Sequence, residues 1–262
     1  MSKIRRRGLV ASVSYEVTDP TVDSQVIQLK SAGADVVFIE TAPKAAAQAI
    51  RKIADLNWTP VRYLANVSAS VAAVLKPAGL DINKGIITAQ YLKDATDPQW
   101  ANDADFKEWK AWMAKYIRIG NLADSGYVYA YAVSSTLHDC LKRCGDDLTR
   151  ANLMKQAASM KNLVVPLLLP GVKINTSPTD FYPIQAVNLA RFSGETWELF
   201  GGVPSNESTW ATLPAEFRSV TLAPGSTGDA LPVEQTFASD ETRQGTALTQ
   251  IPDPGCSFSQ DA

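Results

Sequence analysis

Over the first ninety residues, the apolar positions of the chain switch repeatedly between two patterns. Short apolar runs at residues 9–14, 36–39, 61–65 and 85–92 are typical of strands, and the segments between them carry apolar residues at helical spacing. The run at 36–39 shows no alternation, which predicts a strand covered on both faces. This series of strands and helices predicts an α/β fold with a parallel sheet, right-handed crossovers and helices on both faces.

The helices between these strands have recognisable starts and ends. Asp19-Pro20 predicts the start of the first helix, because Asp can cap it and Pro is preset for the first helical position, and Gly33 ends it. The next two helices are expected at 44–56 and 69–75. The expected buried faces are Val22, Val26 and Leu29 in the first helix and Ala46, Ala49, Ile50 and Ile53 in the second.

After Asp97-Pro98 the pattern becomes helical and later returns to strands. Helices are expected around 106–116 and 125–143, followed by a third that Thr149 caps. Apolar residues mark the buried faces of the first and third of these helices, namely Phe106, Trp109, Met113 and Tyr116, and Leu153, Ala157 and Met160. Between 164 and 200 short strands alternate with turns, and Arg191-Phe192 with Trp197-Glu198 predicts a hairpin.

Residues 203–262 have a different composition from the rest of the chain. They contain eight acidic residues, two Arg and no Lys, together with six Pro and fifteen Ser or Thr. Because so few apolar residues cannot offset an ordering entropy of about 1–2 kcal/mol per residue, this segment is expected to be a disordered tail. The chain has no internal repeat.

Composition narrows the class of protein. At 262 residues, 45% hydrophobic and a net charge of −2, the chain can bury a sizeable core, and it lacks an apolar run long enough for membrane insertion. Its one basic run, Lys3–Arg7, is too small to predict nucleic-acid binding. The apolar stretch that follows, Gly8–Val13, is too short for a signal peptide, so the chain is expected to be cytoplasmic if expressed as given.

The chain offers little for catalysis. Its single histidine, His138, stands beside Asp139 and Cys140, but consecutive helix residues point in different directions and cannot form one proton relay. The common hydrolase, zinc and nucleotide-binding motifs are missing from the sequence. We therefore expect His138 on a helix surface, with no catalytic residues, no metal and no cofactor.

Three cysteines are present, Cys140, Cys144 and Cys256, without CxxC or Cys/His metal spacing. Cys140 and Cys144 lie four residues apart on one helix face, where the Cβ directions suit a disulfide poorly. They are expected to be packing thiols.

Aromatic and acidic residues of the helical segment have mainly structural interpretations. Tyr127 and Tyr131 share one helix face while Tyr129 points away, which indicates core packing for one set, with a tyrosine bordering a cleft as the alternative. Trp109 and Trp112 are expected to be core and surface. The acidic pairs, Asp103 with Asp105 and Asp146 with Asp147, precede helices and are expected to cap them and to stay in solvent.

Ligands of open parallel sheets bind outside the carboxyl ends of the strands. Two loops occupy such positions, 40–44 and 66–68. Helix amides and the side chains of Thr41, Asn66 and Ser68 could bind the polar ends of a small ligand, and Glu40 could receive an ammonium group. Helix capping by Thr41 and Ser68 is the alternative.

At this point the sequence resembles a known family. The matching segments are Tyr15–Gln25, Leu29–Lys30, Gly33–Val36, Leu75–Gly79, Gly85–Ile87, Asp97–Trp100, Cys144–Thr149, Leu169–Gly171 and Asn175–Ile184. In order, they resemble the type I solute-binding proteins of ABC importers for leucine, isoleucine, valine, amides and related solutes. The resemblance covers residues 9–201.

The resemblance implies a periplasmic receptor with two Rossmann-like lobes that close on a solute. Residues 9–92 would form the second, ligand-binding lobe, 93–165 the helical part of an incomplete first lobe, 166–202 strands returning to the second lobe, and 203–262 the tail. The start of the first lobe would be missing. Family members often place a Tyr and an acidic residue in these loops, where this sequence has Ala42 and Val67, and the departure argues against leucine specificity. The ligand could be an amide, an aromatic acid or another small carboxylate.

By this resemblance the chain is expected to be a truncated substrate-binding component of an ABC importer for branched-chain amino acids or related small solutes, such as amides and aromatic acids. It would bind a small-molecule solute, an amino acid or an analogue, and dock on ABC permease subunits. A ligand-sensing module of a regulator or receptor with the same fold is the alternative. An enzyme is the third hypothesis and would need a turnover that depends on Glu40 or His138.

Overall fold

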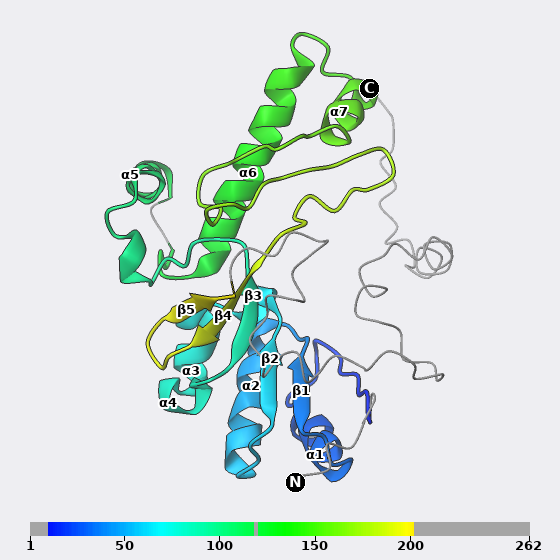
Figure 1. Ribbon diagram of the computed structural model, residues 1–262, viewed down its shortest axis with the longest axis vertical. Helices are drawn as coiled ribbons and strands as arrows, with labels where there is room; N and C mark the ends of the chain where they lie inside the picture. The colour runs from blue at the N-terminus through cyan, green and yellow to red at the C-terminus, as the bar shows by residue number, and fades with distance from the viewer. Residues whose placement is uncertain (1–9, 118–119, 202–262) are drawn as a thin grey trace, which may run out of the picture. The chain divides into compact units, whose positions relative to one another are not determined.

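A single five-stranded sheet organises the N-terminal part of the computed structural model, which describes residues 10–117 and 120–201. Its strands are β1 (Val36–Ile39), β2 (Val61–Leu64), β3 (Ile87–Gln90), β4 (Asn188–Phe192) and β5 (Trp197–Phe200), in that spatial order. β1, β2 and β3 run parallel, as predicted, whereas β4 and β5 are antiparallel additions at the far edge (Figure 1). The predicted hairpin is confirmed, with Phe192 opposite Trp197 and Arg191 opposite Glu198.

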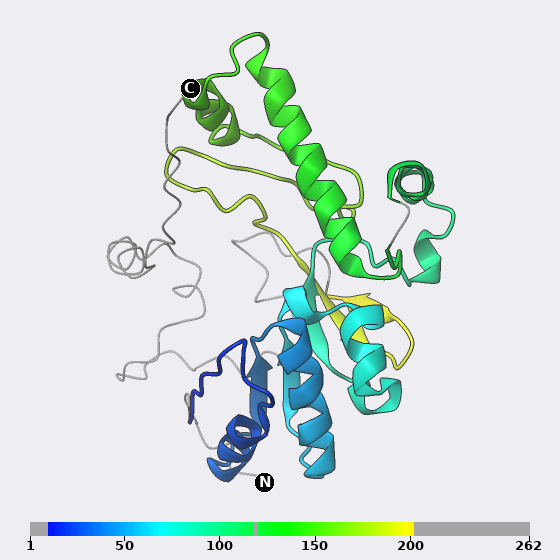
Figure 2. The same ribbon diagram turned by 180° about the vertical axis from the view of Figure 1, so that it is seen from behind.

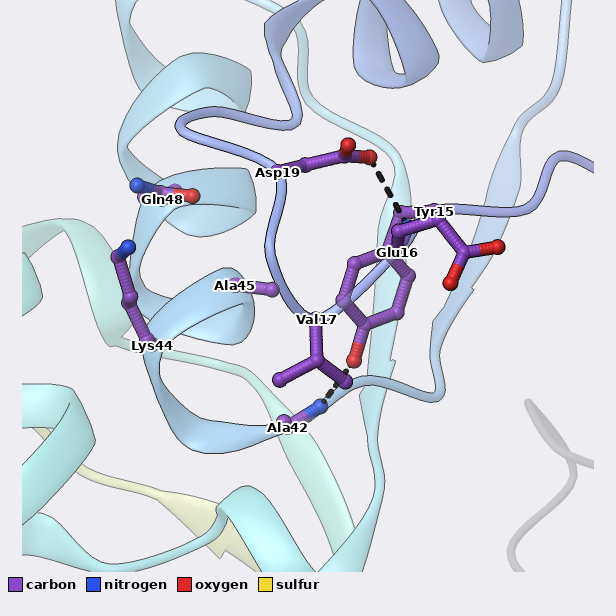
Figure 3. Close-up of a pocket in the computed structure, with 8 residues that line it drawn as sticks. All are labelled: Tyr15, Glu16, Val17, Asp19, Ala42, Lys44, Ala45 and Gln48. Carbon is purple, nitrogen blue, oxygen red and sulfur yellow. Dashed lines mark hydrogen bonds between the residues drawn. The ribbon is translucent and has the colours of Figure 1, made fainter.

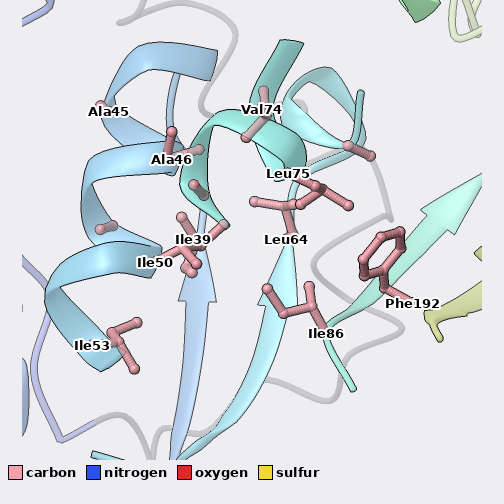
Figure 4. Close-up of a cluster of buried hydrophobic side chains, with 14 of the residues drawn as sticks. Ile39, Ala45, Ala46, Ile50, Ile53, Leu64, Val74, Leu75, Ile86 and Phe192 are labelled. Atoms are coloured by element: carbon pink, nitrogen blue, oxygen red, sulfur yellow. The ribbon is translucent and has the colours of Figure 1, made fainter. Parts of the chain in front are cut away.

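Helices cover one face of this sheet, so the prediction of helices on both faces is wrong for the described residues. Their bounds are α1 (Asp23–Ser31), α2 (Pro43–Asp55), η1 (Asn66–Ser68), η2 (Val71–Leu75), α3 (Lys76–Ala78) and α4 (Leu80–Asn83). Figure 2 shows α2 lying across the covered face, and Figure 4 shows its apolar side chains meeting those of the strands and of η2. Ile50 and Ile53 of α2 are buried against Ile39 and Leu64, which confirms the helix face read from the sequence.

The other face of the sheet corrects the prediction that residues 36–39 are covered on both sides. Val37 and Ile39 point toward the helices and are buried, but the Phe38 side chain is 72% exposed. Its ring stacks on Tyr63 of the neighbouring strand, with ring centroids 4.8 Å apart and planes 11° from parallel. The apolar run at residues 36–39 therefore has two roles: Val37 and Ile39 belong to the core, and Phe38 forms an exposed aromatic pair with Tyr63.

The segment before β1 departs from the prediction in two respects. Residues 10–14 form no strand, and α1 begins at Asp23 instead of at Asp19-Pro20. The Asp19 carboxylate accepts a hydrogen bond from the Glu16 amide at 2.9 Å, so it closes a turn and does not cap the helix. The end of α1 is as predicted, since Gly33 takes the left-handed φ of 74° that favours glycine.

The helical part contains η3 (Pro98–Trp100), α5 (Ala104–Tyr116), α6 (Ser125–Cys144) and α7 (Arg150–Ala157). The predicted caps are confirmed: the Asp103 carboxylate accepts from the Phe106 amide at 3.1 Å, and the Thr149 hydroxyl accepts from the Asn152 amide at 3.3 Å. The expected core is wrong at one end of α5, where Tyr116 is 56% exposed. It is also wrong for α7, which ends at Ala157 without a buried residue, so that the buried Met160 lies beyond the helix. None of the helices in the described part of the chain is long and apolar enough to cross a membrane.

The aromatic residues of these helices also follow the sequence interpretation. Trp109 is fully buried and Trp112 is 41% exposed. Tyr127 and Tyr131 pack against the core of α5 and α6, whereas Tyr129 is 52% exposed. The tail predicted at residues 203–262 lies outside the described residues.

The segment that follows β3, at residues 91–93, pairs with a second extended segment at residues 167–169. The Lys93 amide donates to the Leu167 carbonyl at 2.9 Å, and the Leu169 amide donates to the Tyr91 carbonyl at 2.8 Å. The Lys93 ammonium also contacts both carboxylate oxygens of Asp103 at 2.8 Å, which ties the start of α5 to this segment.

Candidate functional site

The carboxyl ends of β1 and β2 meet at one edge of the sheet, because the two strands are parallel and their last residues, Ile39 and Leu64, are paired. The Ala65 amide extends this pairing by donating to the Ile39 carbonyl at 3.1 Å. The two loops singled out from the sequence, 40–44 and 66–68, start from this edge. The structure therefore places the predicted ligand-binding residues at neighbouring positions.

Ser68 fastens one loop to the other. Its side chain is fully buried, and its hydroxyl donates to the Thr41 carbonyl. The alternative that Ser68 caps a helix is wrong, because Ser70 takes that role by accepting from the Ala73 amide at 3.2 Å. Ser68 thus holds the backbone of the loop after β1 in place.

Thr41 is the unusual residue of this edge. Its hydroxyl oxygen is buried and has no hydrogen-bond partner among the residues that the structure describes. The alternative that Thr41 caps α2 is also wrong, since Ala42 occupies the N-cap position and no side chain bonds there. An unsatisfied buried hydroxyl costs about 1–3 kcal/mol, which is the kind of cost that functional sites carry.

The remaining predicted residues differ in their availability. The Asn66 amide nitrogen donates to the Ala89 carbonyl of β3 at 2.8 Å, so that end of its side chain is structural. Glu40 is exposed, and Val67 is 66% exposed. The two loops at this edge therefore present a carboxylate and an apolar side chain to solvent.

A hollow beside the start of α2 adds residues that the loop analysis missed (Figure 3). Its cavity volume is only about 60 Å³ and it opens to solvent; its lining is Tyr15, Glu16, Val17, Asp19, Ala42, Lys44, Ala45 and Gln48. The Tyr15 hydroxyl accepts from the Ala42 amide at 2.7 Å, so the phenol occupies the first free amide of the helix. Tyr15 and Ala42 are 27 residues apart, and no local pattern links them.

The residues around His138 do not converge on a reaction centre. His138 is exposed on α6, as predicted, and Cys140 is buried. Asp139 pairs with Arg143 at 2.6 Å. Within residues 10–117 and 120–201, no group of three or more His, Cys, Asp or Glu side chains is arranged to hold a metal ion. Cys140 and Cys144 are free and buried, in agreement with their expected role as packing thiols.

Comparison with known proteins identifies both a family and a fold. The sequence family described as periplasmic binding protein matches residues 5–196. A substrate-binding periplasmic protein from Ralstonia solanacearum aligns over 71% of this chain and 51% of its own, with a TM-score of 0.57 and 16% identity. No protein of curated function matches the sequence.

Two further solved structures give the same picture. A branched-chain amino acid ABC transporter protein from Thermus thermophilus with bound valine aligns over 76% of this chain and 51% of its own, with a TM-score of 0.55 and 16% identity. A leucine binding protein from Thermotoga maritima aligns over 74% of this chain and 51% of its own, with a TM-score of 0.54 and 15% identity. The chain thus spans about half the length of these structures, and at such identities the likeness concerns the fold.

Proposed function

Because the chain belongs to the periplasmic binding protein family, with the type I fold, we propose that it binds a small solute at the carboxyl edge of β1 and β2 as the solute-binding component of an ABC importer. The observation that carries the proposal is the buried Thr41 hydroxyl next to the start of α2, which has no hydrogen-bond partner within residues 10–117 and 120–201. A ligand oxygen or nitrogen would satisfy it.

The edge supplies complementary groups for the two ends of a small zwitterion. The start of α2 favours a negative group through its helix dipole, and the exposed Lys44 adds a positive charge there. The exposed Glu40 carboxylate accepts an ammonium group. Ser68 and Asn66 act indirectly, because their hydrogen bonds fix the loops that carry Thr41 and Val67.

The proposed solute class is branched-chain amino acids, with amides and aromatic acids as related candidates. Ala42 and the exposed Val67 present small apolar surfaces where an aliphatic side chain can pack. The name of the Thermus thermophilus structure states a bound valine, which makes valine the first solute to test. The permease partners and a periplasmic location belong to the same proposal, through the family.

A calorimetric panel tests this proposal. The full chain is titrated with valine, leucine, isoleucine, acetamide and benzoate. We expect Glu40→Gln to weaken amino acid binding by about tenfold, or about 1.4 kcal/mol, without affecting benzoate, which has no ammonium group.

The matched control is Asp35→Asn, an exposed acid at the opposite end of β1. This variant should bind every solute as the unmodified chain does. The proposal is contradicted if no solute binds, or if the Glu40 and Asp35 variants behave alike toward the amino acids.

A further inference from the structure

The helix α6 carries an apolar ridge that faces solvent. Every fourth residue along this ridge is a large apolar side chain, and residues four apart lie on one face of a helix. The exposed fractions are 52% for Tyr129, 47% for Val133, 50% for Leu137 and 39% for Leu141. The buried face of the helix is a different row, which includes Val128, Ala132 and Cys140. The ridge therefore lies outside the core, and the solute-binding proposal does not use it.

A row of small residues runs beside the ridge. Gly126, Ala130 and Ser134 are all exposed and follow the same four-residue spacing. Residues at this spacing form ridges with grooves between them, and two helices pack by seating a ridge of one in a groove of the other. The small side chains leave a groove that can take large ones. One face of α6 thus offers both a ridge and a groove, which is what a symmetric contact between identical surfaces requires.

We propose that this face of α6 is the contact surface of a homodimer, in which two copies of the chain pack their α6 helices antiparallel about a two-fold axis. An axis between Val133 and Ser134 places each ridge residue of one copy opposite the small row of the other. The facing pairs are Val133 with Ser134, Leu137 with Ala130, and Leu141 with Gly126. At each end of the contact, Tyr129 faces the exposed His138.

Charge favours the antiparallel orientation. The N-cap of α6 is Asp124, and the last turn carries the exposed Lys142. Antiparallel packing about the proposed axis brings Lys142 of each copy beside Asp124 of the other, whereas parallel packing would place like charges together. The helix dipoles add to the preference, because each positive N-terminus then lies beside a negative C-terminus.

The size of the face suits a dimer of moderate stability. Tyr131 lies one turn from Ser134, and its ring centroid is 5.4 Å from that of Trp112 on α5, so exposed Trp112 and Tyr116 continue the apolar surface. At roughly 150–250 Å² for each large side chain, these two and the four ridge residues expose about 600 Å². Two copies would bury about 1,200 Å², the lower end of the range for specific interfaces. We therefore expect a dissociation constant in the micromolar range.

Sedimentation velocity of the full chain over a concentration series tests this proposal. We expect a monomer–dimer equilibrium. Leu137→Ala should weaken the dimer by about 30-fold, because the two-fold axis makes each substitution count twice. Alanine is a good helix former, so the monomer should keep its fold. The matched control is Leu148→Ala, the same change at a leucine 65% exposed outside α6, which should leave the dissociation constant unchanged.

Disulfide cross-linking tests the orientation, in chains that also carry Cys256→Ser to remove that thiol. Ser134→Cys places the two new thiols beside the axis, where mild oxidation should link the copies. Lys142→Cys is the control, because its two thiols lie about 26 Å apart along the antiparallel pair at 1.5 Å per residue, too far for a disulfide.

Four results would overturn the proposal. They are a monomer at every concentration, association that continues beyond the dimer, equal effects of the Leu137 and Leu148 variants, and cross-linking that fails at Ser134→Cys or succeeds at Lys142→Cys.

Discussion

Replacing Thr41 with Val is expected to stabilise the protein and weaken its hold on a solute. The Thr41 hydroxyl is buried and has no partner in the part of the chain that the structure describes, so the folded state bears the cost of removing it from water. Valine has nearly the same shape but carries a methyl group in place of the hydroxyl. We expect the free energy of unfolding to rise by about 1 kcal/mol, from the lower end of the cost of an unsatisfied polar group.

The same substitution removes the hydrogen bond that the solute would make. A hydrogen bond contributes about 1 kcal/mol, so affinity should fall by roughly fivefold to tenfold. Urea denaturation followed by circular dichroism measures the stability change, with the slope of the transition unchanged because the exposed area is the same. Titration calorimetry with the tightest solute of the panel measures the affinity.

Thr88→Val is the matched control within the same sheet. Thr88 is 2% exposed, and its hydroxyl donates to the Leu64 carbonyl at 2.8 Å. Removing a satisfied hydroxyl should lower the free energy of unfolding by about 1 kcal/mol, opposite in sign to Thr41→Val. The reasoning is refuted if both variants are destabilised alike, or if Thr41→Val stabilises the fold without changing affinity.

Two further predictions concern the fold. Burial acts to raise the pKa of Asp103, but its hydrogen bonds with the Lys93 ammonium and the Phe106 amide lower the pKa below its usual value. The resulting stability is present above about pH 4, the range of an unfolded Asp, and is lost as pH falls through the lowered pKa. Asp103→Asn should flatten this acid loss in denaturant titrations, because asparagine keeps a good N-cap but cannot titrate. An unchanged pH profile would contradict the prediction. Ile50→Ala, at a fully buried position, should lower the free energy of unfolding by about 2–5 kcal/mol. Phe38→Ala, at a position 72% exposed, should change it by less than about 1 kcal/mol. Equal losses in urea denaturation would show that the core is misassigned.

Local patterns explain why much of the fold could be predicted. The face of α2 that carries Ile50 and Ile53 and the hairpin of β4 and β5 are encoded by residues close in sequence, and the structure confirms them. Asp19 shows the limit of this approach. Aspartate is a common helix N-cap, but the Asp19 carboxylate accepts a hydrogen bond from the Glu16 amide and so closes a turn instead of starting a helix.

Sequence rules indicate where a candidate site should lie, but not how its residues are bonded. The general rule for parallel sheets led to the loops at 40–44 and 66–68, since it depends only on the order of strands. The bonds of Ser68 and Tyr15 to the loop after β1 each join residues 27 apart, so only tertiary packing reveals them. The same packing leaves the Thr41 hydroxyl without a partner among the described residues, which capping rules could not foresee.

Mapping of solute binding by NMR tests the central claim most directly. The tightest-binding solute of the panel is added to the ¹⁵N-labelled full chain, and amide shifts are followed to saturation. We predict that the largest changes fall in residues 40–44 and 66–68, at the carboxyl edge of β1 and β2. Failure of every solute to shift these amides, or a saturable response centred on α5, α6 or α7 instead, would contradict the account.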